Sequence, residues 1–396
     1  MPLRTKQRLV LVKTEGASYG VDSSPTGSNA LLVNDDLQLS PLTGGTVSRR
    51  VIRPYRGAYE SSIVNTQVGI TFSVELAGSG AAGTAPALAD VLRSCATAQT
   101  VTAAALTGTA AAGAAGGITL AAGASSVNGF YVGQIITITT GTGSGSIGVI
   151  VAYDGTTKVC NVNAMNGADF TPGASSGYSI AANVSYRPIS ATSGISDTSS
   201  TITYNIDGVQ HKLLGCRGTA SINMALGEFG GISFTMTGIY VTPTDTAQST
   251  YTLAYANQAV PLVYRADNVR ATRFLNYGGC FDGITLDFGN TVNYRELVGC
   301  TKEVVIPDGE SSGTVMMEAA PIASLDPFTA SLTDGSTSAL STVIYGAAGN
   351  RVSLVVPRCD IGQPSYTTKD GYEMLNIPYT ALPSALGNDD FYLVYS

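Results

Sequence analysis

Residues 46–52 read TVSRRVI, and residues 291–297 read TVNYREL. Four positions match at one constant spacing: Thr46 with Thr291, Val47 with Val292, Arg50 with Arg295, and Ile52 with Leu297. A pair of alternating apolar residues precedes each stretch, Leu37 and Leu39 in the first and Ile284 and Leu286 in the second. Alternation with a period of two is typical of a β-strand with one buried face. The sequence therefore predicts a β-domain that occurs twice.

Composition supports a β-rich chain. Of the 396 residues only 12% are charged, 44% are hydrophobic, and 46 are glycine. Such a chain favours short strands joined by tight turns, and its length predicts two or three domains. So little charge on so long a chain also suggests that part of the surface is covered in an assembly.

The chain divides into two β-domains and an insertion. We expect the first domain to comprise residues 1–96 and 190–245 and the second to comprise residues 256–396. Residues 97–189 lie between the two parts of the first domain. Their start, Thr97–Ser126, is rich in Ala, Gly and Thr and predicts an extended or flexible link, and a small β unit follows at Gly129–Ile180.

Individual elements can be located by pattern. Gln67–Leu76 alternates cleanly and predicts a strand, whereas Pro86–Cys95 (PALADVLRSC) has apolar residues at helical spacing and predicts a helix on the sheet. Asp207-Gly208 between two alternating runs predicts a hairpin turn. Leu325–Gly346 corresponds in position to the helix of the first copy.

No catalytic, cofactor-binding or metal site is predicted. Gly143, Gly145 and Gly148 spell GxGxxG, but the β-branched run that follows favours a hairpin turn over a dinucleotide loop. The single histidine, His211, lies in an alternating run and is expected on a strand surface. The carboxylate pairs Asp35-Asp36 and Asp389-Asp390 are adjacent in sequence, so their side chains point to opposite faces of a strand.

The cysteines and the net charge exclude further classes. Six widely spaced cysteines without a CxxC pair suggest buried free thiols in a reducing cytoplasm rather than a zinc site or a disulfide framework: Cys95, Cys160, Cys216, Cys280, Cys300 and Cys359. A net charge of −7 argues against tight non-specific binding of nucleic acid. The uncharged stretch between Arg93 and Asp154 consists of small residues, so we expect no membrane span.

Arg49, Arg50, Arg53 and Arg56 form the densest cationic cluster. Two interpretations have equal weight: a contact with acidic groups of a neighbouring subunit, or a solvated loop. Arg295 occupies the matching position in the second copy and joins the candidate contact residues.

Two stretches carry a family resemblance. Pro86–Cys95 and the meander Asp207–Tyr240 (DGVQHKLLGCRGTASINMALGEFGGISFTMTGIY), in the order set by the strands before them, resemble the major tail tube proteins of long-tailed, non-contractile bacteriophages. The resemblance implies a sandwich of two β-sheets with a flanking helix. It also implies that subunits join their sheets into rings around a channel, and that the rings stack into a tube in the virion tail.

The resemblance sets the full expectation. The fold is mainly β, with two tail-tube-like β-sandwich domains, each with a flanking helix, and a small inserted β domain. Members of the family form six-fold rings, so a duplicated chain implies a trimer with pseudo-six-fold symmetry in preference to a hexamer. The implied partners are the chain itself and the tape-measure and tail-terminator proteins. DNA would pass without specific binding, and assembly would occur in the host cytoplasm.

Two other classes stay open from the residues alone. One is a different virion β-protein, such as a capsid decoration or tail-tip subunit. The other is a carbohydrate-binding adhesin module, which the 20 tyrosines could support although tryptophan is absent.

Overall fold

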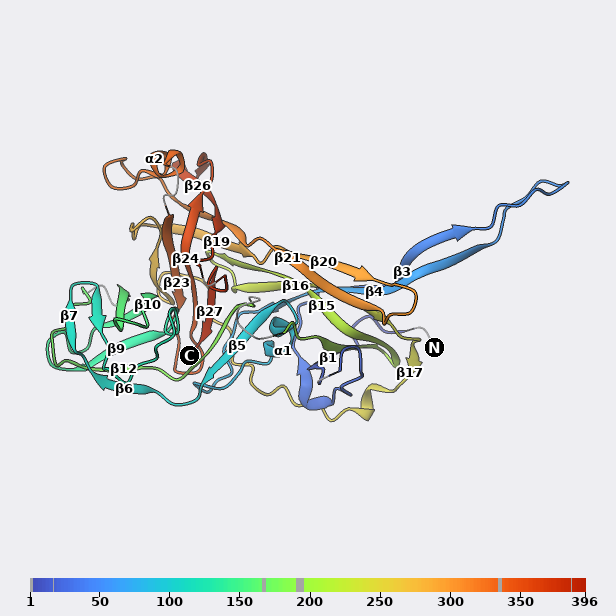
Figure 1. The fold of residues 1–396 in the computed structure, drawn as a ribbon, viewed down its shortest axis with the longest axis horizontal. Helices are drawn as coiled ribbons and strands as arrows, with labels where there is room; N and C mark the ends of the chain where they lie inside the picture. Colours follow the sequence, from blue (N-terminus) through green and yellow to red (C-terminus); the bar gives the residue numbers. More distant parts are fainter. Residues whose placement is uncertain (1–2, 17, 166–168, 190–195, 334–336, 386) are drawn as a thin grey trace.

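The computed structural model describes residues 3–16, 18–165, 169–189, 196–333, 337–385 and 387–396. It is mainly β, with one large sheet, a curled half-barrel sheet and a two-stranded sheet, and its helices are short (Figure 1). The large sheet contains β1 (Arg8–Thr14), β2 (Ala30–Leu31), β3 (Gln38–Ser48), β4 (Ser61–Glu75), β5 (Thr97–Thr102), β13 (Asn183–Pro188), β14 (Ser200–Ile206), β15 (Val209–Ala225), β16 (Gly231–Tyr240), β17 (Thr244–Asp245), β18 (Val269–Arg273), β19 (Phe281–Asp287), β22 (Ser312–Glu318), β23 (Thr337–Ile344), β24 (Val352–Ile361), β25 (Ser365–Lys369), β26 (Tyr372–Ala381) and β27 (Tyr392–Tyr395).

The remaining elements are fewer. The half-barrel sheet contains β6 (Leu106–Thr109), β7 (Ala112–Ala114), β8 (Gly117–Thr119), β9 (Ile135–Thr140), β10 (Ile147–Tyr153), β11 (Val159–Ala164) and β12 (Gly177–Ile180). The two-stranded sheet pairs β20 (Asn290–Arg295) with β21 (Glu303–Gly309). The helical segments are α1 (Ala89–Arg93), α2 (Pro327–Leu332), η1 (Gly27–Asn29) and η3 (Gln248–Thr250).

Eight strands of the large sheet form one continuous antiparallel run in the order β3-β4-β16-β15-β19-β22-β26-β25. The middle of the run is a long-range connection, because β15 pairs with β19 over Ser221–Ala225 and Gly283–Asp287. This pairing joins strands from the first part of the chain to strands from the last part. The eight strands therefore make a single wall.

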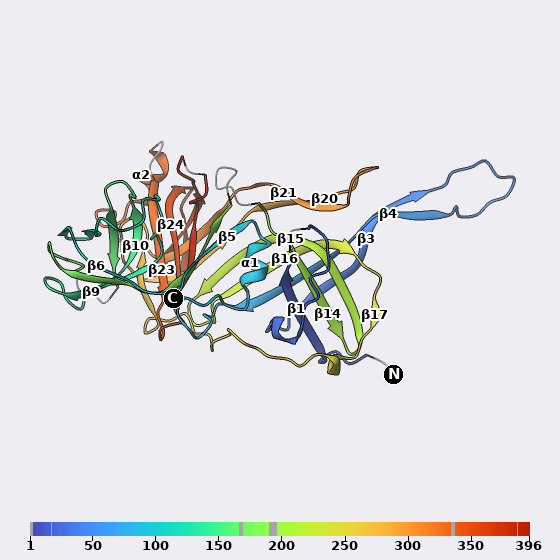
Figure 2. The same ribbon diagram turned by 60° about the horizontal axis from the view of Figure 1, so that its bottom comes forward.

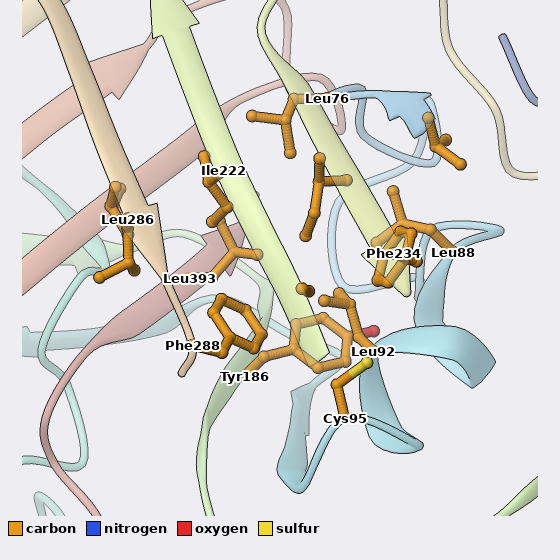
Figure 3. Close-up of a cluster of buried hydrophobic side chains, with 14 of the residues drawn as sticks. Leu76, Leu88, Leu92, Cys95, Tyr186, Ile222, Phe234, Leu286, Phe288 and Leu393 are labelled. Carbon is orange, nitrogen blue, oxygen red and sulfur yellow. The ribbon is translucent and has the colours of Figure 1, made fainter. Parts of the chain in front are cut away.

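The main core lies against one face of this wall. Side chains such as Phe72, Ile222, Phe234 and Leu286 alternate along their strands, are at most 1% exposed, and belong to one apolar cluster. Figure 3 shows Ile222, Phe234 and Leu286 together with Leu92 and Cys95 of the α1 region and Tyr186 and Leu393 of the other strands in that cluster. The alternation that predicted strands is therefore the alternation that builds the core.

Helix α1 is shorter than the predicted span Pro86–Cys95. It covers only Ala89–Arg93, although Val91 and Leu92 are fully buried as their spacing predicts. Ala96 adopts a left-handed φ of 54°, and the Thr97 hydroxyl donates to the Leu92 carbonyl at 2.7 Å. The chain thus turns away after one and a half turns and enters β5.

The second helix is also brief. Among the described residues of the predicted region Leu325–Gly346, only Pro327–Leu332 is helical, and β23 begins at Thr337. Asp326 caps α2 by accepting a hydrogen bond from the Thr329 amide at 2.9 Å, and proline occupies the first turn.

The inserted region is more ordered in its first part than the sequence predicts. Thr97–Ser126 was expected to be a link, but it contributes β5 to the large sheet and β6, β7 and β8 to the half-barrel. Small residues can form strands when neighbours supply the pairing, and β5 pairs along its length with β13. The GxGxxG motif begins in the hairpin turn between β9 and β10, as predicted, with Gly143 and Gly145 at positive φ, and its last residue, Gly148, lies in β10. The half-barrel packs on Val343, Val355, Tyr392 and Val394 of the large sheet.

The N-terminal segment is fastened by one buried carboxylate. Glu15 is 7% exposed and accepts hydrogen bonds from the amides of Gly215 (2.7 Å) and Gly20 (2.8 Å). It also accepts from the hydroxyls of Ser199 (2.6 Å) and Thr201 (3.1 Å). These bonds tie the segment after β1 to β14 and β15.

Replacing Phe234 by alanine is expected to lower the free energy of unfolding by about 3–5 kcal/mol, because burial is lost and a cavity remains. Urea denaturation followed by circular dichroism measures this change. The matched control is Thr235→Ala on the exposed side of the same strand, for which we expect less than about 0.5 kcal/mol. Equal effects of the two changes would contradict the assignment of the core face.

Candidate functional site

Two hairpins extend from the body of the molecule. In the first, β3 and β4 run beyond the core and end in a tip of residues 49–60, where the Arg49 amide donates to the Glu60 carbonyl at 2.9 Å. The second is β20 and β21, which follow directly on β19 and precede β22. Figures 1 and 2 show both hairpins pointing toward the same end of the molecule. The tip of the first hairpin has no core of its own, so its shape suits contact with another molecule. The second hairpin lies against β15 and β16, and its Val304 is fully buried.

The structure brings four of the five candidate arginines together in the first tip. Arg49, Arg50, Arg53 and Arg56 all lie within it, and none makes an ion pair in the part of the chain that the structure describes. Arg53 instead stacks on tyrosines, with its guanidinium carbon 4.7 Å from the ring centroid of Tyr59 and 5.8 Å from that of Tyr55. The tip thus presents unpaired positive charge.

Arg295 lies apart from the other four. It stands at the end of β20 and pairs with Glu303 of β21 at 3.1 Å. A second ion pair, Lys302 with Glu296 at 3.0 Å, closes the same hairpin end. Both pairs are largely exposed and add little stability. Their charge is satisfied within the hairpin, unlike that of the first tip.

Apolar side chains accompany the charges on both hairpins, and the sequence reasoning missed them. Ile52 in the first tip and Val298 in the second are fully exposed, at 104% and 107%. Further exposed apolar residues on the two hairpins are Val47, Val51, Ile63, Val64 and Leu297. The sequence did contain a signal for them, because these apolar residues stand next to charged residues near the predicted turns. Exposed apolar surface of this kind indicates a protein contact.

The eight-stranded wall has a second surface, opposite the core, which we call the polar face. Its members are mostly hydroxyl and amide side chains: Gln38, Ser40, Thr71, Ser221, Asn223, Ser233, Thr235, Thr285, Thr314, Thr367, Asn376 and Thr380. Directly paired residues of neighbouring strands share a face. The hydroxyl oxygens of Thr285 on β19 and Thr314 on β22, for example, are hydrogen-bonded at 2.9 Å. The half-buried Met316 and the buried Met374 also lie on this side.

The polar face carries little charge, and most of it is negative. Glu75, Asp287 and Glu318 are its carboxylates, and its cation Lys369 is ion-paired with Asp282. Further along β15, Arg217 is turned to the backbone carbonyls of Val304 (2.7 Å) and Asp197 (3.0 Å). A surface of this composition has weak attraction for an anionic polymer.

The structure also places the titratable residues that the sequence singled out. His211 lies on β15, as predicted, and partial burial lowers its pKa. Burial also raises the pKa of Asp390 to about 6, with the neighbouring Asp389 as the second cause. Among the described residues no group of three or more His, Cys, Asp or Glu side chains could hold a metal ion. Helices long and apolar enough to cross a membrane are likewise missing from the described part.

The prediction for the cysteines was correct for four and wrong for two. Cys95, Cys160, Cys216 and Cys359 are buried free thiols, and burial raises the pKa of each. Cys280 and Cys300 are exposed, because they lie in the turns that lead into β19 and β21 rather than inside a strand.

Comparison with known families decides the identity. The family model for phage tail tube proteins matches residues 5–381, which is nearly the whole chain. The chain belongs to the phage tail tube protein family. It is a structural subunit of the virion tail that self-assembles into a tube, and it is not an enzyme. No curated protein matches the chain.

Membership of the tail tube family selects among the classes that the residues left open. It favours the tail tube over the capsid decoration, tail-tip and adhesin interpretations. The matched span includes the hairpins, α1 and all strands of the polar face.

Replacing Arg53 by alanine is expected to speed chymotrypsin cleavage after Tyr55 or Tyr59 about two- to fivefold. An exposed cation–π contact contributes about 0.5–1 kcal/mol to the ordered tip. Limited proteolysis of the unassembled subunit measures the change. Arg50→Ala is the matched control, since Arg50 makes no ion pair or ring contact in the described structure, and equal acceleration by both changes would count against the stacked tip.

Proposed function

We propose that this chain is the major tail tube subunit of a long-tailed, non-contractile phage, and that it carries two copies of the tube domain. Residues 1–96 and 190–245 form the first tail-tube-like β-sandwich, residues 256–396 form the second, and residues 97–189 form an outward insertion. Three chains then complete a ring with pseudo-six-fold symmetry.

One observation carries the duplication: the same strand order occurs twice. In the first half, strands pair in the order β1-β14-β15-β16-β4-β3. In the second half, they pair in the order β18-β23-β24-β26-β22-β19. Chain order agrees as well, because a projecting hairpin and then a short helix follow the first strands of each half. Two halves of independent origin would not be expected to share both the strand order and the chain order.

The polar face is proposed to line the channel. In a ring of three chains the apolar face of each wall is already buried, which leaves the polar face for the lumen. Its hydroxyl, amide and acidic side chains would let DNA pass without holding its phosphates. The insertion packs on the opposite side, against Val343 and Val355, and would decorate the outside.

The hairpins are proposed to connect rings. The tip with Arg49, Arg50, Arg53 and Arg56 supplies charge and apolar surface, and the hairpin with Arg295 is its counterpart in the second copy. The N-terminal segment Leu3–Ser28 is a second candidate contact. Tape-measure and tail-terminator proteins, as partners inside and at the end of the tube, and assembly in the host cytoplasm belong to the same proposal by family analogy.

Removing the tip tests the role of the first hairpin. Ser48 and Ser61 face each other across β3 and β4, so residues 49–60 can be replaced by an Asn-Gly turn without disturbing the strands. The variant should keep its far-UV circular dichroism but give single rings or monomers, whereas the unaltered chain gives tubes by negative-stain electron microscopy at the same concentration. Long tubes from the variant would refute the ring-to-ring role.

Adding charge tests the channel wall. Asn223→Lys with Thr235→Lys should give tubes that retain short duplex DNA in a nuclease-resistant form at low salt, because the lumen becomes cationic. The matched control places the same charges on the insertion, with Ala111→Lys and Ala122→Lys at exposed positions. DNA bound by the control should remain open to nuclease. Protection by both variants or by neither would contradict the assignment of the polar face.

A further inference from the structure

The wall of eight strands ends in two strands that have one partner each. Among the described residues β25 pairs only with β26, and all five residues of β25 are exposed. At the other end, β3 pairs only with β4 within the described structure. Figure 1 shows β26 and β3 far apart on the molecule. Open strand edges of this kind invite pairing with another chain.

Within the chain, one such strand edge is already paired with a strand of the other half; we call this pairing the β15–β19 junction. The second half of β15 pairs with β16 on one edge and with β19 on the other, in the register Ser221 with Asp287 through Ala225 with Gly283. This ladder joins the first half of the molecule to the second. Its register is a guide to how the second half of one chain would pair with the first half of another.

β25 occupies, in the second half, the position that this part of β15 occupies in the first. β15 pairs first with β14 and then with β16, in one long strand. In the second half β24 pairs with β23 and, at its end, with β26; the strand is interrupted at residues 362–364, and β25 continues along β26. The counterpart of β19 is β3, because both lead into a projecting hairpin and each pairs with the strand that returns from it. The missing neighbour of β25 is therefore a β3 strand.

We propose that β25 of one chain pairs antiparallel with β3 of a second copy of this chain, in the register of the β15–β19 junction. Matching Ile222 with Tyr366 and Leu286 with Leu39 fixes the register. It sets Tyr366 opposite Leu39, Thr367 opposite Gln38, and Lys369 opposite Asp36. This inference rests on the proposed ring and names the strands that close it.

The side chains fit the register. Tyr366 points to the core side, where its ring lies 5.7 Å from that of Phe328, yet it is 55% exposed. Its counterpart Ile222 is 1% exposed because Leu286 and the rest of β19 cover it. Leu39 of the incoming strand would cover Tyr366 in the same way. Lys369 and Asp36 carry opposite charges, which favours a cross-strand pair.

The interface is head-to-tail, so it generates a closed ring when the rotation per chain closes. Both open edges of every chain disappear in such a ring, and the wall becomes a continuous barrel. The internal junction and the junction between chains would then alternate around the channel.

Disulfide trapping tests the proposal. Directly opposed residues in an antiparallel pair have Cα atoms about 4.5–5.5 Å apart, within the range that a disulfide spans. Thr367→Cys and Gln38→Cys are introduced in separate chains in which the exposed Cys280 and Cys300 are replaced by serine. The two variants are mixed, assembled and oxidised, and covalent dimers are measured on non-reducing gels. A chain that carries both changes should give covalent closed rings.

The matched control combines Thr367→Cys with Leu42→Cys, four residues further along β3 and about 13 Å away. We expect covalent dimers from the Gln38 pair, and at least tenfold fewer from the Leu42 pair or from either variant alone. Tubes that form without the Gln38 cross-link overturn the register and leave the proposed function intact. Failure of the unaltered chain to form rings or tubes overturns both.

Discussion

The backbone ladder between β15 and β19 is the connection on which the rest of the molecule depends. It links strands that are more than fifty residues apart in the chain and turns two half-sheets into one eight-stranded wall. With that ladder in place, Ile222 and Leu286 fall side by side on the core face, and Ser221 and Asp287 fall side by side on the polar face. Without it, both half-sheets would expose a long edge.

The two faces of the wall divide structural and functional roles. The apolar face is filled by α1 and by the other strands of the large sheet, so it specifies the fold (Figure 3). The side chains of the polar face are mostly short and neutral, and most of its charged groups are carboxylates. Because side chains alternate along a strand, each strand contributes some residues to the core and the residues between them to the opposite surface. Residues of the polar face, the proposed channel wall, can therefore vary without disturbing the core.

Local pattern predicted most strands but not their long-range arrangement. The alternation in Gln67–Leu76 and the Asp207-Gly208 turn were sufficient, since both depend on neighbours within a few residues. The length of α1 was overestimated because its end depends on Ala96 and on the Thr97 hydroxyl bond, which helical periodicity does not encode. The strands hidden in Thr97–Ser126 gain their pairing from distant partners such as β13.

The candidate site was also predictable only in part: the residue types could be found in the sequence, but their positions in space could not. The cluster Arg49, Arg50, Arg53 and Arg56 was visible as a charge run, but only the structure puts it at the tip of a long hairpin. The exposure of the apolar residues Ile52 and Val298 was not predictable, because exposure is a property of the fold around them. The polar face was not predictable at all, since its members come from eight strands spread over most of the chain. Whether the halves are true repeats stays a proposal that their common strand order supports.

The most direct test of the account is the mass of one closed ring, measured by native mass spectrometry. The tip-deleted chain, whose rings should not stack into tubes, is the suitable sample. Two tube domains in each chain predict a ring of three chains, each of about the 40.6 kDa of the full chain less the deleted tip. A ring of six such chains would contradict the proposed ring of three chains with two tube domains in each.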